Sequence, residues 1–131
     1  MKTPIVYVLI SSERDFFLEE FWVSLYSLRH FHPSDKVTVL TDAPTSKKID
    51  ERPALKALIT EIKVVPMPDE YDGRLRSRTL KTSVRNLIDG DFLTIDTDTV
   101  ICQSLDEVDS LSIKNIGKCT APLKITLLIS L

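Results

Sequence analysis

Four short segments rich in apolar and β-branched residues constrain the fold of this chain more than any other feature. They span residues 5–10, 36–42, 61–65 and 92–95. The first and the last are continuously apolar or nearly so, which is typical of strands buried on both faces of a parallel sheet. Apolar residues at helical spacing follow the first segment and precede the last, as expected for strand–helix units. The sequence therefore predicts an α/β fold with a mostly parallel sheet flanked by helices.

The composition is that of a globular domain: 131 residues, 43% hydrophobic and 27% charged. A net charge of −2 gives no indication of nucleic-acid binding. Cys102 and Cys119 lack the spacing of a metal or redox motif, so a reduced intracellular protein is the default. The chain enters its first strand without a cleavage-site pattern, and no apolar stretch reaches spanning length. We therefore expect no transmembrane segment and a cytoplasmic location.

Two carboxylates, Asp96 and Asp98, directly follow the last apolar segment. Ligands of open α/β sheets bind at the carboxyl ends of the strands, which is where these residues are expected. Hard cations such as Mg²⁺ and Mn²⁺ take carboxylate and phosphate oxygens. An Asp-x-Asp at this position therefore predicts a metal–phosphate site, although an ordinary polar turn would show the same pattern.

The segment just before this strand is strongly basic. It contains five cations and no acidic residue: Arg74, Arg76, Arg78, Lys81 and Arg85. We expect a helix that Ser77 caps at its start and that Gly90, in a left-handed conformation, caps at its C-terminus. Arg78 and Lys81 would share one of its faces, so they could neutralise a diphosphate near the acidic strand end. A solvated basic face is the alternative.

Three further features bear on the site. Asp42 ends the second segment, where an acidic residue could bind a nucleoside or cap the next helix. Pro53 should divide the helical pattern of residues 46–59 into two pieces. His30 and His32 fall at the end of the first helical pattern, where we expect them at the surface or capping the helix.

The Asp-x-Asp segment resembles two families. Residues 96–101 fit the phosphatase motif of the haloacid dehalogenase superfamily, in which Asp96 would be the nucleophile. They also fit the nucleotide-sugar glycosyltransferases of the GT-A fold. The phosphatases normally carry the motif on the first strand of the core and need further polar residues well downstream, whereas about thirty residues follow Thr99. Three strand–helix units before the motif favour the glycosyltransferases.

The whole segment 77–98 resembles family-eight glycosyltransferases and their GT-A relatives, in which a helix bearing Arg and Lys precedes an apolar strand ending in Asp-x-Asp. The resemblance extends over residues 4–120. It implies retaining transfer of a sugar from a nucleotide-diphospho-sugar donor, most simply a UDP-sugar. It also implies Mn²⁺ or Mg²⁺ as a Lewis acid on the leaving diphosphate.

The resemblance also implies roles for individual residues. Ser11 and Ser12 would lie beside the nucleoside, with Asp42 as a further candidate. Arg78 and Lys81 would face the diphosphate or steady the carboxylates. Asp98 would be the principal metal ligand, and Asp96 would hold both metal and ribose.

The chain also departs from that family. Members continue well beyond this point, with an acceptor-binding half and a later metal ligand that is usually a His, whereas no His follows His32. We therefore expect residues 1–118 to form the donor-binding half of a GT-A-like domain, incomplete for hexosyl transfer and with an unidentified acceptor. Residues 119–131 form an apolar tail whose alternation could add a strand. A non-catalytic nucleotide- or metal-binding module and a phosphohydrolase using Asp96 are the alternatives.

Overall fold

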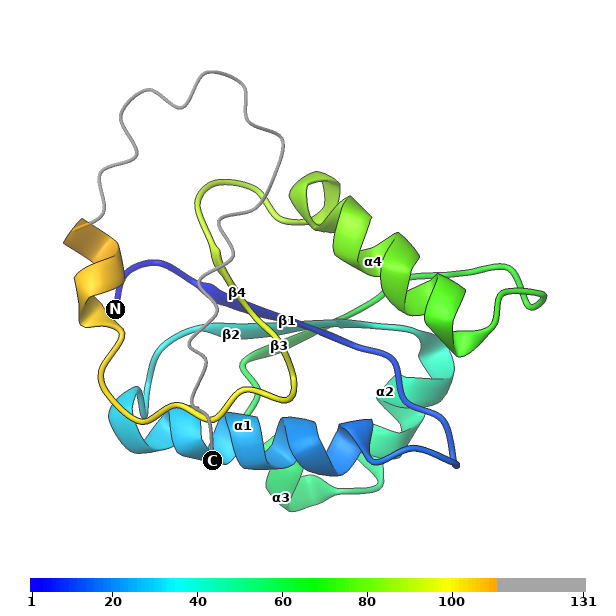
Figure 1. The fold of residues 1–131 in the computed structure, drawn as a ribbon, viewed down its shortest axis with the longest axis horizontal. Helices are drawn as coiled ribbons and strands as arrows, with labels where there is room; N and C mark the ends of the chain where they lie inside the picture. The colour runs from blue at the N-terminus through cyan, green and yellow to red at the C-terminus, as the bar shows by residue number, and fades with distance from the viewer. Residues whose placement is uncertain (111–131) are drawn as a thin grey trace.

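The computed structural model describes residues 1–110, so the apolar tail of residues 119–131 and its expected strand lie outside the described residues. The described chain forms a four-stranded sheet in the order β3-β2-β1-β4, with every pairing parallel (Figure 1). The strands are β1 (Ile5–Leu9), β2 (Val37–Thr41), β3 (Glu61–Val64) and β4 (Leu93–Ile95). The predicted α/β class with a parallel sheet is confirmed.

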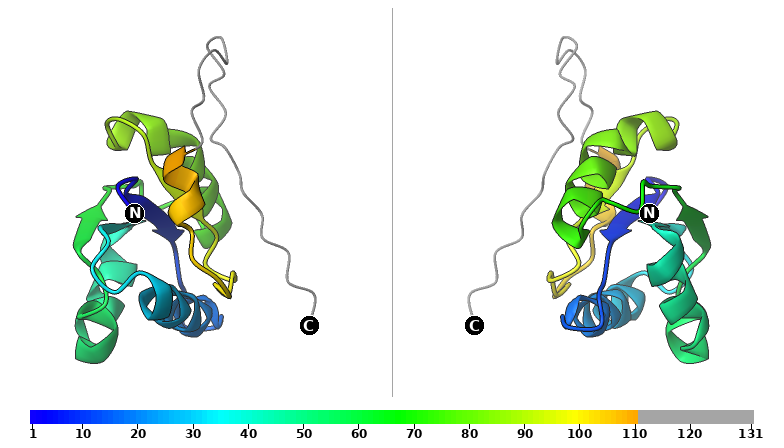
Figure 2. Two further views of the ribbon diagram at one scale, coloured as in Figure 1. Left: turned by 90° about the vertical axis from the view of Figure 1, so that its left-hand side faces the viewer. Right: turned by 90° about the vertical axis from the view of Figure 1, so that its right-hand side faces the viewer.

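Helices cover both faces of this sheet. They are α1 (Phe17–Phe31), α2 (Ala43–Asp50), α3 (Pro53–Lys56) and α4 (Gly73–Leu87), and a 3₁₀ helix, η1 (Asp106–Ser110), follows β4. Figures 1 and 2 show α4 on one face and α1 and α3 on the other. None of the helices in the described part of the chain is both long and apolar enough to cross a membrane.

Alternate residues of β1 supply the two cores. Ile5, Tyr7 and Leu9 belong to the cluster that contains the buried side chains of α1, whereas Val6 and Val8 pack with those of α4. All five side chains are buried. This burial on both faces explains why β1 is apolar at every position instead of at every second one.

The helix boundaries follow local chemistry. Asp72 caps α4, with its carboxylate accepting a hydrogen bond from the Leu75 N–H at 2.8 Å. The expectation of a helix start at Ser77 is therefore wrong, because Asp72 offers an acceptor one turn earlier. Pro53 opens α3, as expected from its fixed φ. Gly90 has the predicted left-handed conformation, with a φ of 78°, but it is not the helix cap: the C-cap of α4 is Ile88, in an extended conformation, two residues earlier.

The strand order creates a switch point beside β1. The chain leaves β1 for β2 on one side, while β4 pairs with the other side of β1, with Tyr7 opposite Ile95. Ligands of open α/β sheets bind in the crevice outside the carboxyl ends of strands at such a point. The loop after β1 and the Asp-x-Asp after β4 both begin there.

Candidate functional site

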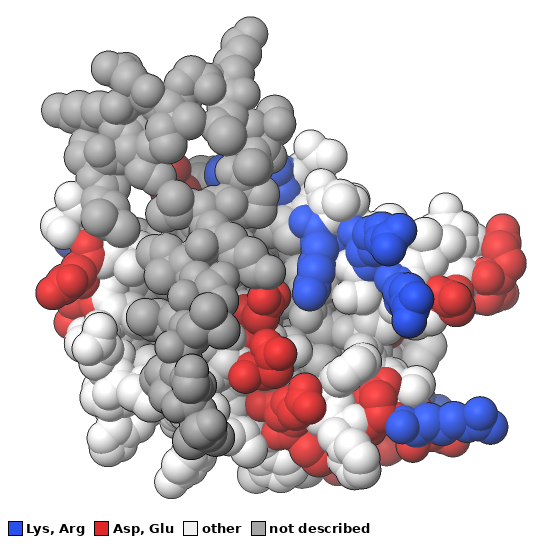
Figure 3. All heavy atoms as spheres, in the orientation of Figure 1, with Lys and Arg blue, Asp and Glu red and all other residues white. Residues whose placement is uncertain are grey.

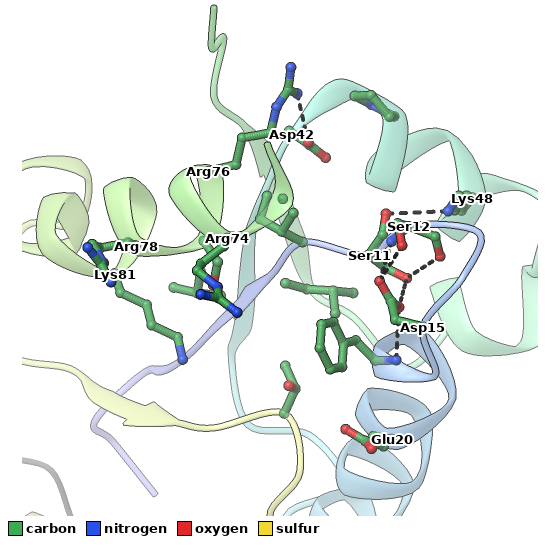
Figure 4. A pocket seen from close by; sticks show the side chains of 18 of the residues that line it. Ser11, Ser12, Asp15, Glu20, Asp42, Lys48, Arg74, Arg76, Arg78 and Lys81 are labelled. Atoms are coloured by element: carbon green, nitrogen blue, oxygen red, sulfur yellow. Dashed lines mark hydrogen bonds and ion pairs between the residues drawn. The ribbon is translucent and has the colours of Figure 1, made fainter. Parts of the chain in front are cut away.

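A cavity of about 1070 Å³ opens at the carboxyl edge of the sheet. It is lined by the loop after β1, the first turns of α1, α2 and α4, and the loop after β4 (Figure 4). All of the site residues expected from the sequence line it: Ser11, Ser12, Asp42, Arg78, Lys81, Asp96 and Asp98. The fold thus brings together residues that are up to 87 positions apart in the chain, since 98 − 11 = 87.

Opposite charges line different walls of this cavity. Arg74, Arg78 and Lys81 project from α4, three to four residues apart, so they share one face of the helix. Carboxylates come from the α1 side and from the loop after β4: Asp15, Glu20, Asp96 and Asp98. In Figure 3 the basic and acidic side chains gather in neighbouring regions of this face. A ligand here would meet cations on one side and anions on the other.

The two walls meet at the Asp-x-Asp. The Lys81 Nζ lies 3.5 Å from a carboxylate oxygen of Asp96, which is partly buried. Asp98 is exposed at the cavity, and the Thr99 N–H donates to the Asp96 carbonyl at 3.1 Å, which closes a tight turn. Two carboxylates beside a basic helix suit Mg²⁺ or Mn²⁺, which complete their shells with phosphate oxygens and water. The donor set therefore fits such an ion.

The loop after β1 is organised by Asp15. Its carboxylate accepts hydrogen bonds from the Ser12 N–H at 2.6 Å, the Ser12 hydroxyl at 2.8 Å and the Ser11 hydroxyl at 2.9 Å. It also accepts from the Phe17 N–H at 3.1 Å. Burial alone would raise the pKa of Asp15, but the hydrogen bonds from Ser12, Ser11 and Phe17 outweigh it and lower this pKa. Both serine hydroxyls donate to Asp15, and the Ser12 oxygen also accepts from the Arg14 N–H at 3.3 Å, so each oxygen keeps a lone pair that could accept from a ligand.

Asp42 has one of the two roles considered for it, that of a helix cap, and it also forms a buried ion pair. One oxygen accepts from the Thr45 N–H at 3.0 Å and caps α2, and the other lies 2.9 Å from an Arg76 guanidinium nitrogen. The Asp42 side chain is 5% exposed and that of Arg76 is 14% exposed. Burial would raise the pKa of Asp42, but hydrogen bonds from Thr45 and Arg76 outweigh it and hold this pKa low. The carboxylate is thus a structural anchor as well as part of the cavity lining.

Several lining residues were not among the expected site residues: Asp15, Glu20, Lys48, Arg74 and Arg76. Lys48 donates to the Ser11 carbonyl at 3.3 Å, and Arg76 donates to the carbonyls of Tyr71 and Pro68 at 2.9 and 3.2 Å. Arg74 and Arg76 belong to the basic segment described above, so the sequence already indicated that they could lie near the site. Lys48 has no such signal, because its place depends on how α2 lies against the loop after β1, where the Thr45 hydroxyl accepts from the Ser11 N–H.

A second polar cluster lies at the opposite end of α1. His32, Asp35 and Asp106 bring their ligand atoms within 4.8 Å of one another. His32 is the C-cap residue of α1, as one of the two expectations had it, but it is only 2% exposed, so a surface position is wrong for it. Its Nε2 accepts from the Leu105 N–H at 2.8 Å, which assigns the ring proton to Nδ1, 2.7 Å from Asp35. A protonated Nδ1 has no lone pair for a metal, and the Met1 ammonium already lies 2.9 Å from Asp35. This cluster is therefore better explained as a structural hydrogen-bond network, which links the N-terminus and the backbone of Leu105 to the end of α1, than as a metal site.

No protein-family model matches the chain, and the search of curated proteins found no match either. The functional argument therefore rests on the geometry of the cavity.

Proposed function

We propose that this chain is the donor-binding domain of a glycosyltransferase, binding a nucleotide-diphospho-sugar, most simply a UDP-sugar, through Mn²⁺ or Mg²⁺. The observation that carries this proposal is the meeting of the basic face of α4 with Asp96 and Asp98 at the switch point of the sheet. A diphosphate needs cations on one side and a carboxylate-held metal on the other. The GT-A resemblance remains the source of the sugar-transfer chemistry.

The proposed roles follow from position. Asp98, exposed at the cavity, is the principal metal ligand, and Asp96 contributes a second carboxylate oxygen. Lys81 and Arg78 neutralise diphosphate oxygens from the helix side. When bound, the metal would stabilise the negative charge that develops on the leaving diphosphate. Ser11 and Ser12 supply acceptors at the nucleoside end, which suits a base that carries an N–H.

The size of the cavity agrees with a ligand of this class. Pockets for small molecules and cofactors typically measure about 300–1,000 Å³. The volume here, about 1070 Å³, lies just above that range and suits a nucleotide sugar better than a single phosphate group. Ser11 and Asp98 both line it, so one ligand could contact the carboxyl ends of β1 and β4 together.

The test is a calorimetric titration of UDP and of UDP-glucose with Mn²⁺ and in excess EDTA. We expect binding to weaken on the order of 10-fold or more without the ion, because carboxylate and phosphate oxygens then repel each other. Asp98→Ala should abolish the metal effect. Asp91→Ala is the matched control, because Asp91 is an exposed carboxylate that precedes the same strand and does not line the cavity.

Three other outcomes would contradict the proposed metal site or favour one of the two alternative functions. Equal UDP affinity in EDTA and in Mn²⁺ would contradict the proposed metal bridge. Binding of UDP-glucose with no release of the sugar would favour a non-catalytic nucleotide-binding module. Release of phosphate from a simple phosphoester, dependent on Asp96, would favour the phosphohydrolase.

A further inference from the structure

We propose that Ser27 of α1 is a positioning residue for the metal site: it fixes the loop of residues 96–100, here called the Asp-x-Asp loop, from its downstream end. The inference rests on the proposed function, because it assigns metal binding to Asp96 and Asp98. Ser27 itself is not among the residues that line the cavity. Its effect on the metal would be exerted through the backbone of the loop.

Contacts with the rest of the fold hold the Asp-x-Asp loop at both of its ends. Upstream, Ile95 belongs to β4 and pairs with Tyr7 of β1. Downstream, the Ile101 N–H donates to the Ser27 hydroxyl oxygen at 2.9 Å, and the Ile101 side chain is buried. Asp98 therefore lies three residues from each anchor, since 98 − 95 = 3 and 101 − 98 = 3.

The Ser27 hydroxyl is oriented to receive this hydrogen bond. It donates its own proton to the Ser24 carbonyl at 2.7 Å, one turn earlier in α1. The lone pairs of the oxygen are then left for the Ile101 N–H, which lies 2.9 Å away. A hydroxyl that is held in this way is a directional acceptor, and it is half-buried.

A second anchor continues the same arrangement. Five residues after Ser27, at the C-cap of α1, His32 Nε2 accepts from the Leu105 N–H at 2.8 Å. Figures 1 and 2 show the segment after β4 running beside α1. Backbone N–H groups that leave a sheet still need acceptors when they are buried. Two side chains, one in α1 and one at its C-cap, supply these acceptors, where a neighbouring strand would otherwise have done so.

This arrangement bears on metal affinity because an exposed carboxylate binds an ion well only when its backbone is already in place. Groups that orient metal ligands from outside typically account for 10- to 100-fold in affinity. Ser27→Ala removes the acceptor of the Ile101 N–H and frees one end of the loop. We expect the affinity for Mn²⁺, measured with UDP present, to fall on the order of 10-fold.

Ser24→Ala is the matched control. Ser24 is a buried serine on the same helix whose hydroxyl lies 3.0 Å from that of Tyr7, so its removal also breaks one buried hydrogen bond of α1. It does not contact the Asp-x-Asp loop through its side chain. We expect Ser24→Ala to lower the melting temperature while leaving the Mn²⁺ affinity within about twofold of the wild type.

Two measurements separate positioning from general loosening. Mn²⁺ binding is followed by electron paramagnetic resonance at fixed UDP, and amide exchange is followed at Ile101. In Ser27→Ala both the affinity and the protection of the Ile101 amide should fall, and in Ser24→Ala neither should. Ser27→Thr, which keeps the hydroxyl, should restore both, and it also serves as the test variant if Ser27→Ala does not fold.

Each remaining outcome overturns the inference. Wild-type Mn²⁺ affinity in folded Ser27→Ala would show that the downstream anchor is dispensable. Equal losses of affinity in Ser27→Ala and Ser24→Ala would show a general effect of α1 stability. Failure of Ser27→Thr to bind Mn²⁺ like the wild type would show that the hydroxyl is not the group that matters. Absence of Mn²⁺-dependent UDP binding in the wild type would instead refute the proposed function, and this inference with it.

Discussion

The buried ion pair between Arg76 and Asp42 can be broken from the arginine side by Arg76→Met. Asp42 would keep its hydrogen bond from the Thr45 N–H but lose the guanidinium 2.9 Å away. Removing one partner of a buried pair typically costs about 3–5 kcal/mol, because the other charge is left unpaired. Arg76 retains some solvent contact, with 14% of its side chain exposed, so we expect about 3 kcal/mol.

Urea unfolding at pH 7, followed by the fluorescence of the single tryptophan, Trp22, measures this loss. The double variant Asp42→Asn/Arg76→Met should recover part of it, because no buried charge then remains without its partner. Arg74→Met is the control: Arg74 is an exposed cation two residues away on α4, and its loss should stay within about 0.5 kcal/mol.

The pH dependence of the free energy of unfolding provides a second check of this prediction. In the wild type the pKa of Asp42 lies below its ordinary value of 3.8, so this group stabilises the fold above about pH 4 and loses that effect on acidification. In Arg76→Met burial is no longer offset by the guanidinium, so the pKa of Asp42 should rise and protonation should relieve the penalty. The gap between the two proteins should therefore shrink as the pH falls from 7 to 4. A gap that stays constant over this range, or that is no larger than for Arg74→Met, would refute the reasoning.

Two further predictions concern the helix face and the N-terminal strand. Lys81→Ala should weaken the binding of UDP by about 1–3 kcal/mol and leave the binding of uridine almost unchanged, because Lys81 would contact the diphosphate. Calorimetry measures both affinities, and equal losses for the two ligands would mean that Lys81 is structural. The backbone N–H of Lys2, with the hydroxyl and N–H of Thr3, lowers the pKa of Asp109 to about 2, so its stabilisation is present above pH 3.8 and is lost as the pH falls towards 2. In Asp109→Asn the melting temperature should change less with pH between 3.8 and 2 than in the wild type. The same dependence of melting temperature on pH in both proteins would contradict this account.

The parts of the fold that could be predicted from the sequence are those set by local pattern. The apolar character of residues 5–10 marked β1 because a strand buried on both faces needs it. Pro53 separated α2 from α3, since a proline ends one helix and opens another. The Asp-x-Asp was found because strand ends and acidic pairs are adjacent in the sequence.

The features that the sequence did not reveal depend on contacts between distant segments. His32 looks like a surface residue at a helix end, but the backbone of residue 105 covers it and supplies a hydrogen bond. Lys48 reaches the Ser11 carbonyl because α2 lies against the loop after β1. The start of α4 is an exception, because its signal is local: Asp72 and Ser77 can both cap a helix, and the structure uses Asp72.

The length of the basic face helps to choose between a diphosphate ligand and a single phosphate. Arg74, Arg78 and Lys81 all line the cavity and extend over seven residues of α4, since 81 − 74 = 7. At a rise of about 1.5 Å per residue, these positions extend roughly 10 Å along the helix axis. A phosphomonoester could contact only part of that length, whereas a nucleotide sugar has a diphosphate with further groups on both sides. The same spacing leaves Lys81 beside Asp96, where a metal would also bind, and puts Arg74 about two turns further away. A ligand that extends from the metal along α4 therefore accounts for all three cations, which is why we favour the nucleotide-sugar assignment over the phosphohydrolase.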